Sequence, residues 1–379
     1  MSSPKKLTSL VLTGGGARGA YQVGVIQALM EITEMEGIQN PFPIISGASA
    51  GAINAAYLAA NANNMRDASK HLAQMWGNIR SESVYNVHFS SIFKIAMRMV
   101  LEISTGGLFK TKQTRSMLDT TPLRNLLSSV IPFENISKQI ETNQLHGISI
   151  QAIDYSSGVN FTFFQGDQSI KPWARSNRKG IRHELTVEHI LASTALPILF
   201  PPVKIGNSYF GDGNLRNYTP LSPSIKMGAD KILVIGVRKT KDMDALEVNL
   251  KPTLGRMISV VLNAILLDNI ELDYERLSRV NNTIKRITDK EGSVGSDLKP
   301  VDAMIIQPSE DLAKIAAEEA GHLPKIIRYL IRGLGSRKEA SDLISNILFE
   351  PSFTQRLMLL GYADAMKIKD EIITFLKSE

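Results

Sequence analysis

The sequence predicts a three-layer α/β/α sandwich with a mainly parallel central sheet, plus a helical C-terminal extension. Two glycine-rich turns each join a short apolar run to a helical stretch, within residues 7–35 and 42–62. Consecutive strand–helix units of this kind form parallel sheets that helices cover on both faces. After residue 310 the chain contains four helical segments separated by proline and glycine breaks, and these predict the extension.

The composition is that of a globular protein. The chain has 379 residues, of which 43% are hydrophobic and 21% charged, enough for one large domain or two smaller ones. It has no cysteine, which excludes disulfides, thiolate metal sites and a cysteine nucleophile. The net charge of +6 suits an anionic membrane surface or nucleic acid, and equally an ordinary solvated surface. Because no nucleic-acid-binding motif is present, we expect no nucleic-acid partner.

The N-terminal stretch does not resemble a targeting segment. Met1–Lys6 leads into Leu7–Thr13, which is too short for the apolar region of a signal peptide and lacks a cleavage site. No run of about 18 apolar residues exists, so no transmembrane helix is expected. We therefore expect a cytoplasmic protein, with peripheral membrane contact left open.

The first glycine-rich turn, Gly14-Gly15-Gly16-Ala17-Arg18-Gly19, lies between the apolar run Leu7–Thr13 and a helix expected over Ala20–Met35. It matches the dinucleotide-binding pattern G-x-G-x-x-G, but that fold needs an acidic residue at the end of the second strand. Glu34 and Glu36 instead fall in the preceding helix and turn. A phosphate-binding loop needs G-K-S/T, which is absent. The remaining interpretation is an oxyanion hole.

The second turn, Gly47-Ala48-Ser49-Ala50-Gly51, follows the strand expected over Phe42–Ser46 and precedes a helix over Ala50–Ala62. Strand, G-x-S-x-G and helix is the context of a nucleophile elbow, in which Gly47 and Gly51 leave room for the tight turn. The alternative is a chance match in a Gly/Ala-rich turn.

Consecutive parallel units bring both turns to the same sheet edge. The N–H groups of Gly15 and Gly16 would then face the Ser49 oxygen, which favours an oxyanion hole. Arg18 either braces this turn, contacts an acidic substrate group, or lies on the surface.

A helix is expected over Ile92–Ile103, where Lys94, Arg98 and Glu102 form a narrow polar stripe on an apolar cylinder. It is either a lid or membrane-facing helix, or a core or dimer-interface helix. The other elements expected along the chain are helices within 64–82 and over Pro122–Val130, Phe133–Thr142 and Thr186–Ser193, a hairpin of Gly147–Asp154 with Val159–Gln165, a basic surface loop over Ile170–Glu184, a short hairpin of Val203–Ile205 with Ser208–Phe210, and a strand over Lys231–Val237.

The chain divides into three expected parts. Residues 1–240 form a catalytic α/β domain. Residues 241–300 hold a long helix, Thr253–Ile287, and the linker Thr288–Lys299, which is rich in Gly, Ser and Asp. Residues 301–379 hold a last strand, Val301–Gln307, and the helical extension.

With Asp212 added to the two turns, the sequence resembles the patatin-like phospholipase family. The resemblance covers about Leu7–Val237, in the family's order, and its motifs are Gly14–Gly19, Gly47–Gly51, the block Ala192-Ser193…Pro197…Phe200-Pro201-Pro202, and Asp212-Gly213. One departure is Asn214, where the family usually has Gly or Ala.

The resemblance implies a Ser–Asp dyad in which Ser49 is the nucleophile and Asp212 is the general base. It implies that the turn Gly14–Gly16 binds the oxyanion and that no metal or cofactor is required. The supporting motif residues are Arg18, Gly19, Gly47, Gly51 and Gly213. The implied activity is hydrolysis of fatty acyl esters in phospholipids and lysophospholipids, at a membrane surface that the enzyme contacts transiently.

Three alternatives stay open. His322 is the only histidine that follows Asp212 and would complete a Ser-His-Asp esterase in the order of α/β-hydrolases. An acyl-CoA thioesterase or an acyltransferase would use the same serine. A non-catalytic lipid-binding module would keep the fold alone. A homo-oligomer is also left open.

Overall fold

The computed structural model describes residues 6–86, 118–239, 269–291, 299–334 and 339–378, together with a few single positions between these ranges. The helix expected over Ile92–Ile103 lies outside the described residues, and so does most of the first half of the expected helix Thr253–Ile287.

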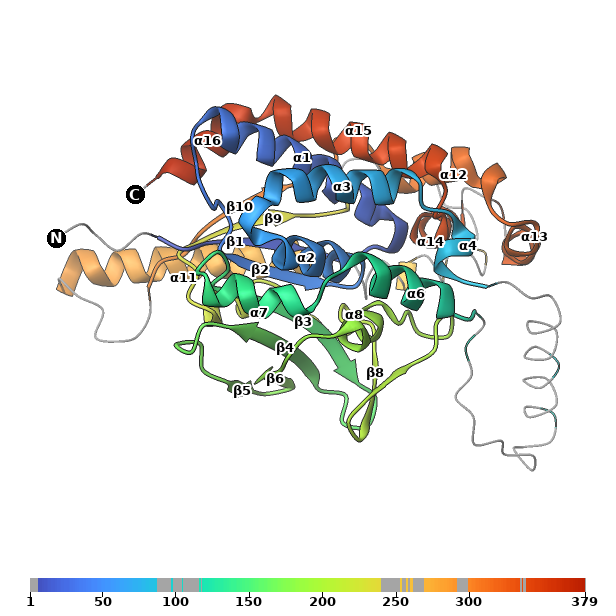
Figure 1. The fold of residues 1–379 in the computed structure, drawn as a ribbon, viewed down its shortest axis with the longest axis horizontal. Helices are drawn as coiled ribbons and strands as arrows, with labels where there is room; N and C mark the ends of the chain where they lie inside the picture. The colour runs from blue at the N-terminus through green and yellow to red at the C-terminus, as the bar shows by residue number, and fades with distance from the viewer. Residues whose placement is uncertain are drawn as a thin grey trace.

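A mixed sheet runs through the centre of the molecule (Figure 1). Among the described residues it has ten strands, in the order β10-β9-β1-β2-β3-β4-β6-β5, with β8 paired to β3 and β7 paired to β8. The first five strands of this order pair in parallel, as predicted. The strands are β1 (Thr8–Leu12), β2 (Ile44–Ala48), β3 (Gly147–Asp154), β4 (Asn160–Gly166), β5 (Trp173–Arg175), β6 (Arg178–Arg182), β7 (Val203–Ile205), β8 (Ser208–Gly211), β9 (Lys231–Ile235) and β10 (Asp302–Ile306).

Alternating side chains of the central strands enter two separate cores. In β1, Leu10 and Leu12 join the larger core, while Val11 joins the smaller one on the opposite face. Because a strand buried on both faces has no polar side to present, β1, β2 and β9 are buried along their whole length. This confirms the three-layer arrangement predicted from the sequence.

Most helices cover the face of the larger core, and α9 and α11 cover the other face. None of the helices in the described residues is both long and apolar enough to cross a lipid bilayer. The helices are η1 (Gly16–Arg18), α1 (Gly19–Met35), α2 (Ala50–Ala60), η2 (Ala62–Asn64), α3 (Met65–Gly77), α4 (Ser81–Val84), α6 (Thr121–Val130), α7 (Glu134–Glu141), α8 (Val187–Thr194), α9 (Ser222–Lys226), α11 (Asn269–Glu291), α12 (Leu312–Glu319), η3 (Ala320–His322), α13 (Lys325–Leu334), α14 (Ser341–Ile347), α15 (Pro351–Lys367) and α16 (Lys369–Lys377).

Two predictions about local structure are wrong. The segment Ile170–Glu184 is not a surface loop, because it forms the hairpin β5–β6, which extends the sheet beyond β4. Trp173 stacks on Phe164 with ring centroids 5.1 Å apart. This apolar contact holds the hairpin against β4, although most residues of the hairpin are basic or polar. The linker expected over Thr288–Lys299 does not begin at Thr288, since α11 continues to Glu291.

The C-terminal extension divides differently from the prediction. The helix α13 ends at Leu334, where a glycine break is expected, but the last expected helical segment is split into α15 and α16 around Ile368.

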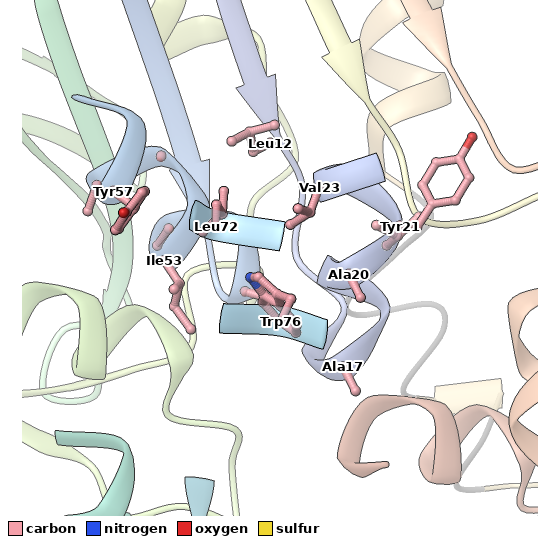
Figure 2. Packing of buried hydrophobic residues seen from close by; sticks show 14 of the residues in the cluster. Leu12, Ala17, Ala20, Tyr21, Val23, Ile53, Tyr57, Leu72 and Trp76 are labelled. Carbon is pink, nitrogen blue, oxygen red and sulfur yellow. The ribbon is translucent and has the colours of Figure 1, made fainter. Parts of the chain in front are cut away.

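The helix α15 lies along α1 (Figure 1). The two backbones approach so closely that a Cβ at Gly361 would collide with the carbonyl oxygen of Tyr21, and a Cβ at Gly24 with that of Met358. Figure 2 shows Trp76 of α3 together with Ala20 of α1 and Ile53 of α2 in the larger core. Phe353 and Leu357 of α15 belong to the same core. The extension therefore packs on the same core as the first strand–helix unit.

We predict that Gly361→Ala destabilises the protein, although alanine is the better helix former. The added methyl group must push the α1 and α15 backbones apart, at a cost of about 1–3 kcal/mol in the free energy of unfolding. Urea unfolding measures this. Gly321→Ala is the matched control, because a Cβ at Gly321 meets nothing within 4 Å. Equal stability of the two variants would contradict the close contact.

Candidate active site

Ser49 lies in the turn between β2 and α2, with φ 52° and ψ −128°. A positive φ is unusual and strained for a residue other than glycine, and such strain typically accompanies a functional position. A Cβ at Gly47 would collide with the carbonyl oxygen of Gly51, and a Cβ at Gly51 with that of Leu12. The tight turn therefore requires both glycines, and it holds the Ser49 side chain at the carboxyl end of β2.

Asp212 meets Ser49 directly. The Ser49 hydroxyl donates a hydrogen bond of 2.7 Å to Asp212 Oδ2, and the Asn214 N–H donates one of 2.8 Å to Oδ1. Asp212 follows β8, which pairs with the end of β3, while β3 also pairs with β2. The sheet thus brings together two residues that are 163 positions apart.

Burial dominates the electrostatics of this pair. Asp212 is fully buried. Burial disfavours the charged form and raises the pKa of Asp212 to about 6, although the hydrogen bonds from Ser49 and Asn214 act in the opposite direction. Above that pH Asp212 is a carboxylate whose affinity for a proton is higher than that of an exposed aspartate.

The role of Ser193 was not predicted from its motif block. The Ser49 N–H donates to Ser193 Oγ at 2.9 Å, and the Gly213 N–H donates to the Ser193 carbonyl oxygen at 3.0 Å. Ser193 lies in α8, whose first turn has a capping box between Thr186 and His189. It therefore ties the Ser49 turn to the Asp212 turn. The motif marked its position, but only the packing of α8 revealed this function.

The turn Gly14–Gly16 lies beside Ser49, because β1 pairs in parallel with β2. A Cβ at Gly14 would come within 2.7 Å of Ser49 Cβ and would collide with the Asn214 amide nitrogen. In the described part of the chain, none of the N–H groups of Gly14, Gly15 and Gly16 donates to another backbone group. The residue that departs from the family pattern, Asn214, thus fills the space that Gly14 leaves open.

Arg18 lies inside the protein and is 2% exposed. Its Nε donates to Ser345 Oγ and its Nη2 to Asp342 Oδ1, both at 2.8 Å. The alternative of a surface arginine is therefore wrong, and Arg18 links the first turn to α14. Gly19 lies where α1 and α2 come close, since a Cβ there would be 2.9 Å from Ala50 Cβ.

An apolar pocket leads to Ser49. Ser49 and Gly16 lie in its wall, and most of the remaining wall comes from helices outside the sequence motifs. This pocket was not predicted from the sequence, because its lining comes from six separate α-helices and the segments that follow them. Its apolar lining includes Ile53 of α2, Trp76 of α3, Leu123 and Leu127 of α6, and Leu196 and Phe349, which follow α8 and α14.

The structure does not place His322 with this pair. Its ring is largely exposed and contacts Glu319 and Ser352. Both oxygens of Asp212 already accept hydrogen bonds from Ser49 and Asn214. Within the described residues, no three His, Asp or Glu side chains gather as ligands of a metal ion would.

Comparisons with known proteins place these features in a family. A family model described as patatin-like phospholipase matches residues 10–225. Among solved structures, VipD from Legionella pneumophila is similar with 14% identity and a TM-score of 0.35, over 98% of this chain and 68% of that one. Human GIVD cytosolic phospholipase A2 is similar with 11% identity and a TM-score of 0.45, over 98% of this chain and 60% of that one. No curated protein sequence matches.

The chain spans about 60% of the length of the human enzyme. The family model covers more than half of this chain, and the matched residues include the glycine turn, Ser49 and Asp212. The chain therefore belongs to the patatin-like phospholipase family, a family of lipid hydrolases.

Proposed function

We propose that this protein is a lipid acyl hydrolase that acts through a Ser49–Asp212 dyad and an acyl-enzyme intermediate. The observation that carries the proposal is the buried 2.7 Å hydrogen bond from the Ser49 hydroxyl to Asp212. A serine is a weak nucleophile until an adjacent base takes its proton, and Asp212 is the base in contact with it.

In the first half-reaction, Asp212 takes the hydroxyl proton while Ser49 Oγ attacks the ester carbonyl carbon. The negative charge that develops on the carbonyl oxygen is stabilised by the N–H groups of the turn Gly14–Gly16, which donate to no backbone group among the described residues. The N-terminus of α2, which begins at Ala50, adds a favourable dipole. The tetrahedral intermediate collapses, the bond to the leaving alcohol breaks, and Asp212 returns the proton to that alcohol.

In the second half-reaction, water attacks the acyl group on Ser49. Asp212 takes a proton from the water, and the bond between the acyl carbon and Ser49 Oγ then breaks. The proton goes back to Ser49, and the fatty acid leaves. One carboxylate thus serves as base and acid in both halves.

The apolar pocket beside Ser49 supports a fatty acyl chain as the group that is transferred. Its lining includes Trp76, Leu123, Leu127 and Phe349, which favour an apolar group and cannot form an ion pair with a charged one. We therefore propose phospholipids and lysophospholipids as substrates, in agreement with the family.

We also propose that the end of the molecule that carries the site contacts a lipid surface. Tyr155 lies against Gly211, next to Asp212, and is partly exposed, as is Tyr209 of β8. Ile198, in the segment before β7, is 72% exposed. Exposed apolar and tyrosine side chains beside a site are typical of surfaces that meet lipid.

We predict that Ser49→Ala and Asp212→Asn each lower kcat by about 10⁴-fold or more, since the nucleophile and its base act as a unit. Fatty acid release from phospholipid vesicles, a short-chain nitrophenyl ester and an acyl-CoA measures this. His322→Ala is the control and should retain activity within about twofold. Loss of activity in a folded His322→Ala variant would favour a triad, and turnover of acyl-CoA alone would favour the thioesterase.

We predict that kcat/KM rises with pH through an apparent pKa of about 6, the value to which burial raises Asp212. Protonated Asp212 cannot accept the Ser49 proton, so the rate falls about tenfold per pH unit below this pKa and levels off above it. A pH–rate profile on the soluble nitrophenyl ester measures this. A flat profile across this range would contradict the role of Asp212 as base.

A further inference from the structure

The helix α14 places the amide side chain of Asn346 in the wall of the mainly apolar pocket. Asn346 lines the pocket together with Ser49 and Gly16 and is 3% exposed. Its backbone carbonyl lies so close to Gly16 that any Cβ there would collide with it. Asn346 is thus beside the turn that faces the ester carbonyl, at the Ser49 end of the pocket.

The orientation of this amide is determined by its neighbour. Asn346 Nδ2 donates a 2.8 Å hydrogen bond to the carbonyl oxygen of Asp342, so the other amide atom is the oxygen. This Oδ1 is buried and has no hydrogen-bond donor among the described residues. A buried acceptor without a donor is costly, and in native proteins such an atom calls for an explanation.

The other polar side chains of the pocket wall already have partners, including Trp76, whose Nε1 donates to Asn54 Oδ1. The Ser49 hydroxyl donates to Asp212, and the Thr194 hydroxyl donates to the Leu191 carbonyl oxygen. Asn346 Oδ1 is therefore the acceptor that remains for a group inside the pocket.

Asn346 is held in place by its surroundings. Arg18 binds Ser345 and Asp342 on the same helix, and the Tyr85 hydroxyl donates to the Ile347 carbonyl oxygen at 2.9 Å. Because α14 is anchored on both sides of Asn346, the amide cannot turn toward solvent without breaking buried hydrogen bonds.

We propose that Asn346 is a specificity-determining residue that accepts a hydrogen bond from a hydroxyl group carried by the substrate close to its scissile carbonyl. This proposal rests on the proposed function and names its substrate class, a hydroxylated acyl ester. The apolar lining favours a hydroxyl on the acyl chain, one or two carbons from the carbonyl. The free glycerol hydroxyl of a lysophospholipid offers the same chemistry from the alcohol side.

The test compares two matched substrate pairs. The first is the nitrophenyl ester of β-hydroxyoctanoate against that of octanoate. The second is a lysophosphatidylcholine against its analogue in which hydrogen replaces the free hydroxyl. We expect the wild type to prefer the hydroxylated member of one pair by about tenfold in kcat/KM, the effect of one hydrogen bond to a buried acceptor. The pair that shows the preference identifies the source of the hydroxyl.

Asn346→Leu removes the acceptor at nearly constant volume, and the preference should then disappear. The Asp342 carbonyl oxygen keeps the hydrogen bond from Ser345 Oγ, so the variant is expected to fold. If its melting temperature falls, Asn346→Ala provides the same comparison. Phe349→Leu is the control, because it alters the pocket without touching a polar group and should slow both members of a pair equally.

No preference in either pair, or a preference that survives Asn346→Leu, would overturn the proposal. If the wild type cleaves none of the four esters, the proposed function fails, and binding decides the role of Asn346. Calorimetry would then compare β-hydroxyoctanoate with octanoate. Tighter binding of the hydroxy acid that Asn346→Leu abolishes supports the role of Asn346, and equal binding rejects it.

Discussion

The hydrogen bond between Ser49 and Asp212 depends on the pairing of three strands. Ser49 follows β2, Asp212 follows β8, and β3 is the strand that pairs with both. A shift of β3 by one residue would carry its alternate side chains to the opposite face and would separate the two turns. The hydrogen bonds of Ser193 to both turns add a second connection that does not pass through the sheet. The distance between Ser49 and Asp212 therefore depends on the strand pairing at this sheet edge and on the contacts of Ser193.

Several residues of the site have features that destabilise the folded protein, and the rest of the fold must offset this cost. Ser49 has a strained backbone, Asp212 is a buried carboxyl with a raised pKa, and Asn346 carries a buried acceptor without a donor. Each of these features lowers stability on its own. The rest of the fold contains two extensive apolar cores, one on each face of the sheet, which offset this cost. Such a concentration of unfavourable features in one place is typical of a functional site.

The C-terminal helices form part of the candidate active site. Arg18 of the first glycine turn forms its ion pair with Asp342 of α14, and α15 meets α1 through Gly24 and Gly361. The last quarter of the chain thus supplies part of the pocket wall and stabilises the first glycine turn through the ion pair of Arg18 with Asp342. A change in α14 is expected to reach the substrate through Asn346 and Phe349, without altering Ser49 or Asp212.

The sequence by itself determined the class of the fold, the two glycine turns, Ser49, and Asp212 as its partner. These features are local: apolar runs, G-x-S-x-G and the hairpin before Asp212 are visible within a few residues, and parallel strands bring their ends to one edge. It also predicted the hairpin β3–β4, because the turn and both apolar strands are contiguous. The prediction that Asp212 is the base came from its place in a family pattern, since one turn aspartate alone has no distinguishing local signal.

Only the tertiary structure decided the features that join distant segments. The pairing of Arg18 with α14, the contact of Ser193 with Ser49 and the apolar pocket depend on packing between elements up to 327 residues apart. The strands β5 and β6 were missed because an edge hairpin with one exposed face has a polar sequence, and Trp173 packs on a residue from another strand. The free acceptor of Asn346 likewise has no sequence signal. Whether a buried amide finds a partner is a matter of three-dimensional surroundings, which no local pattern contains.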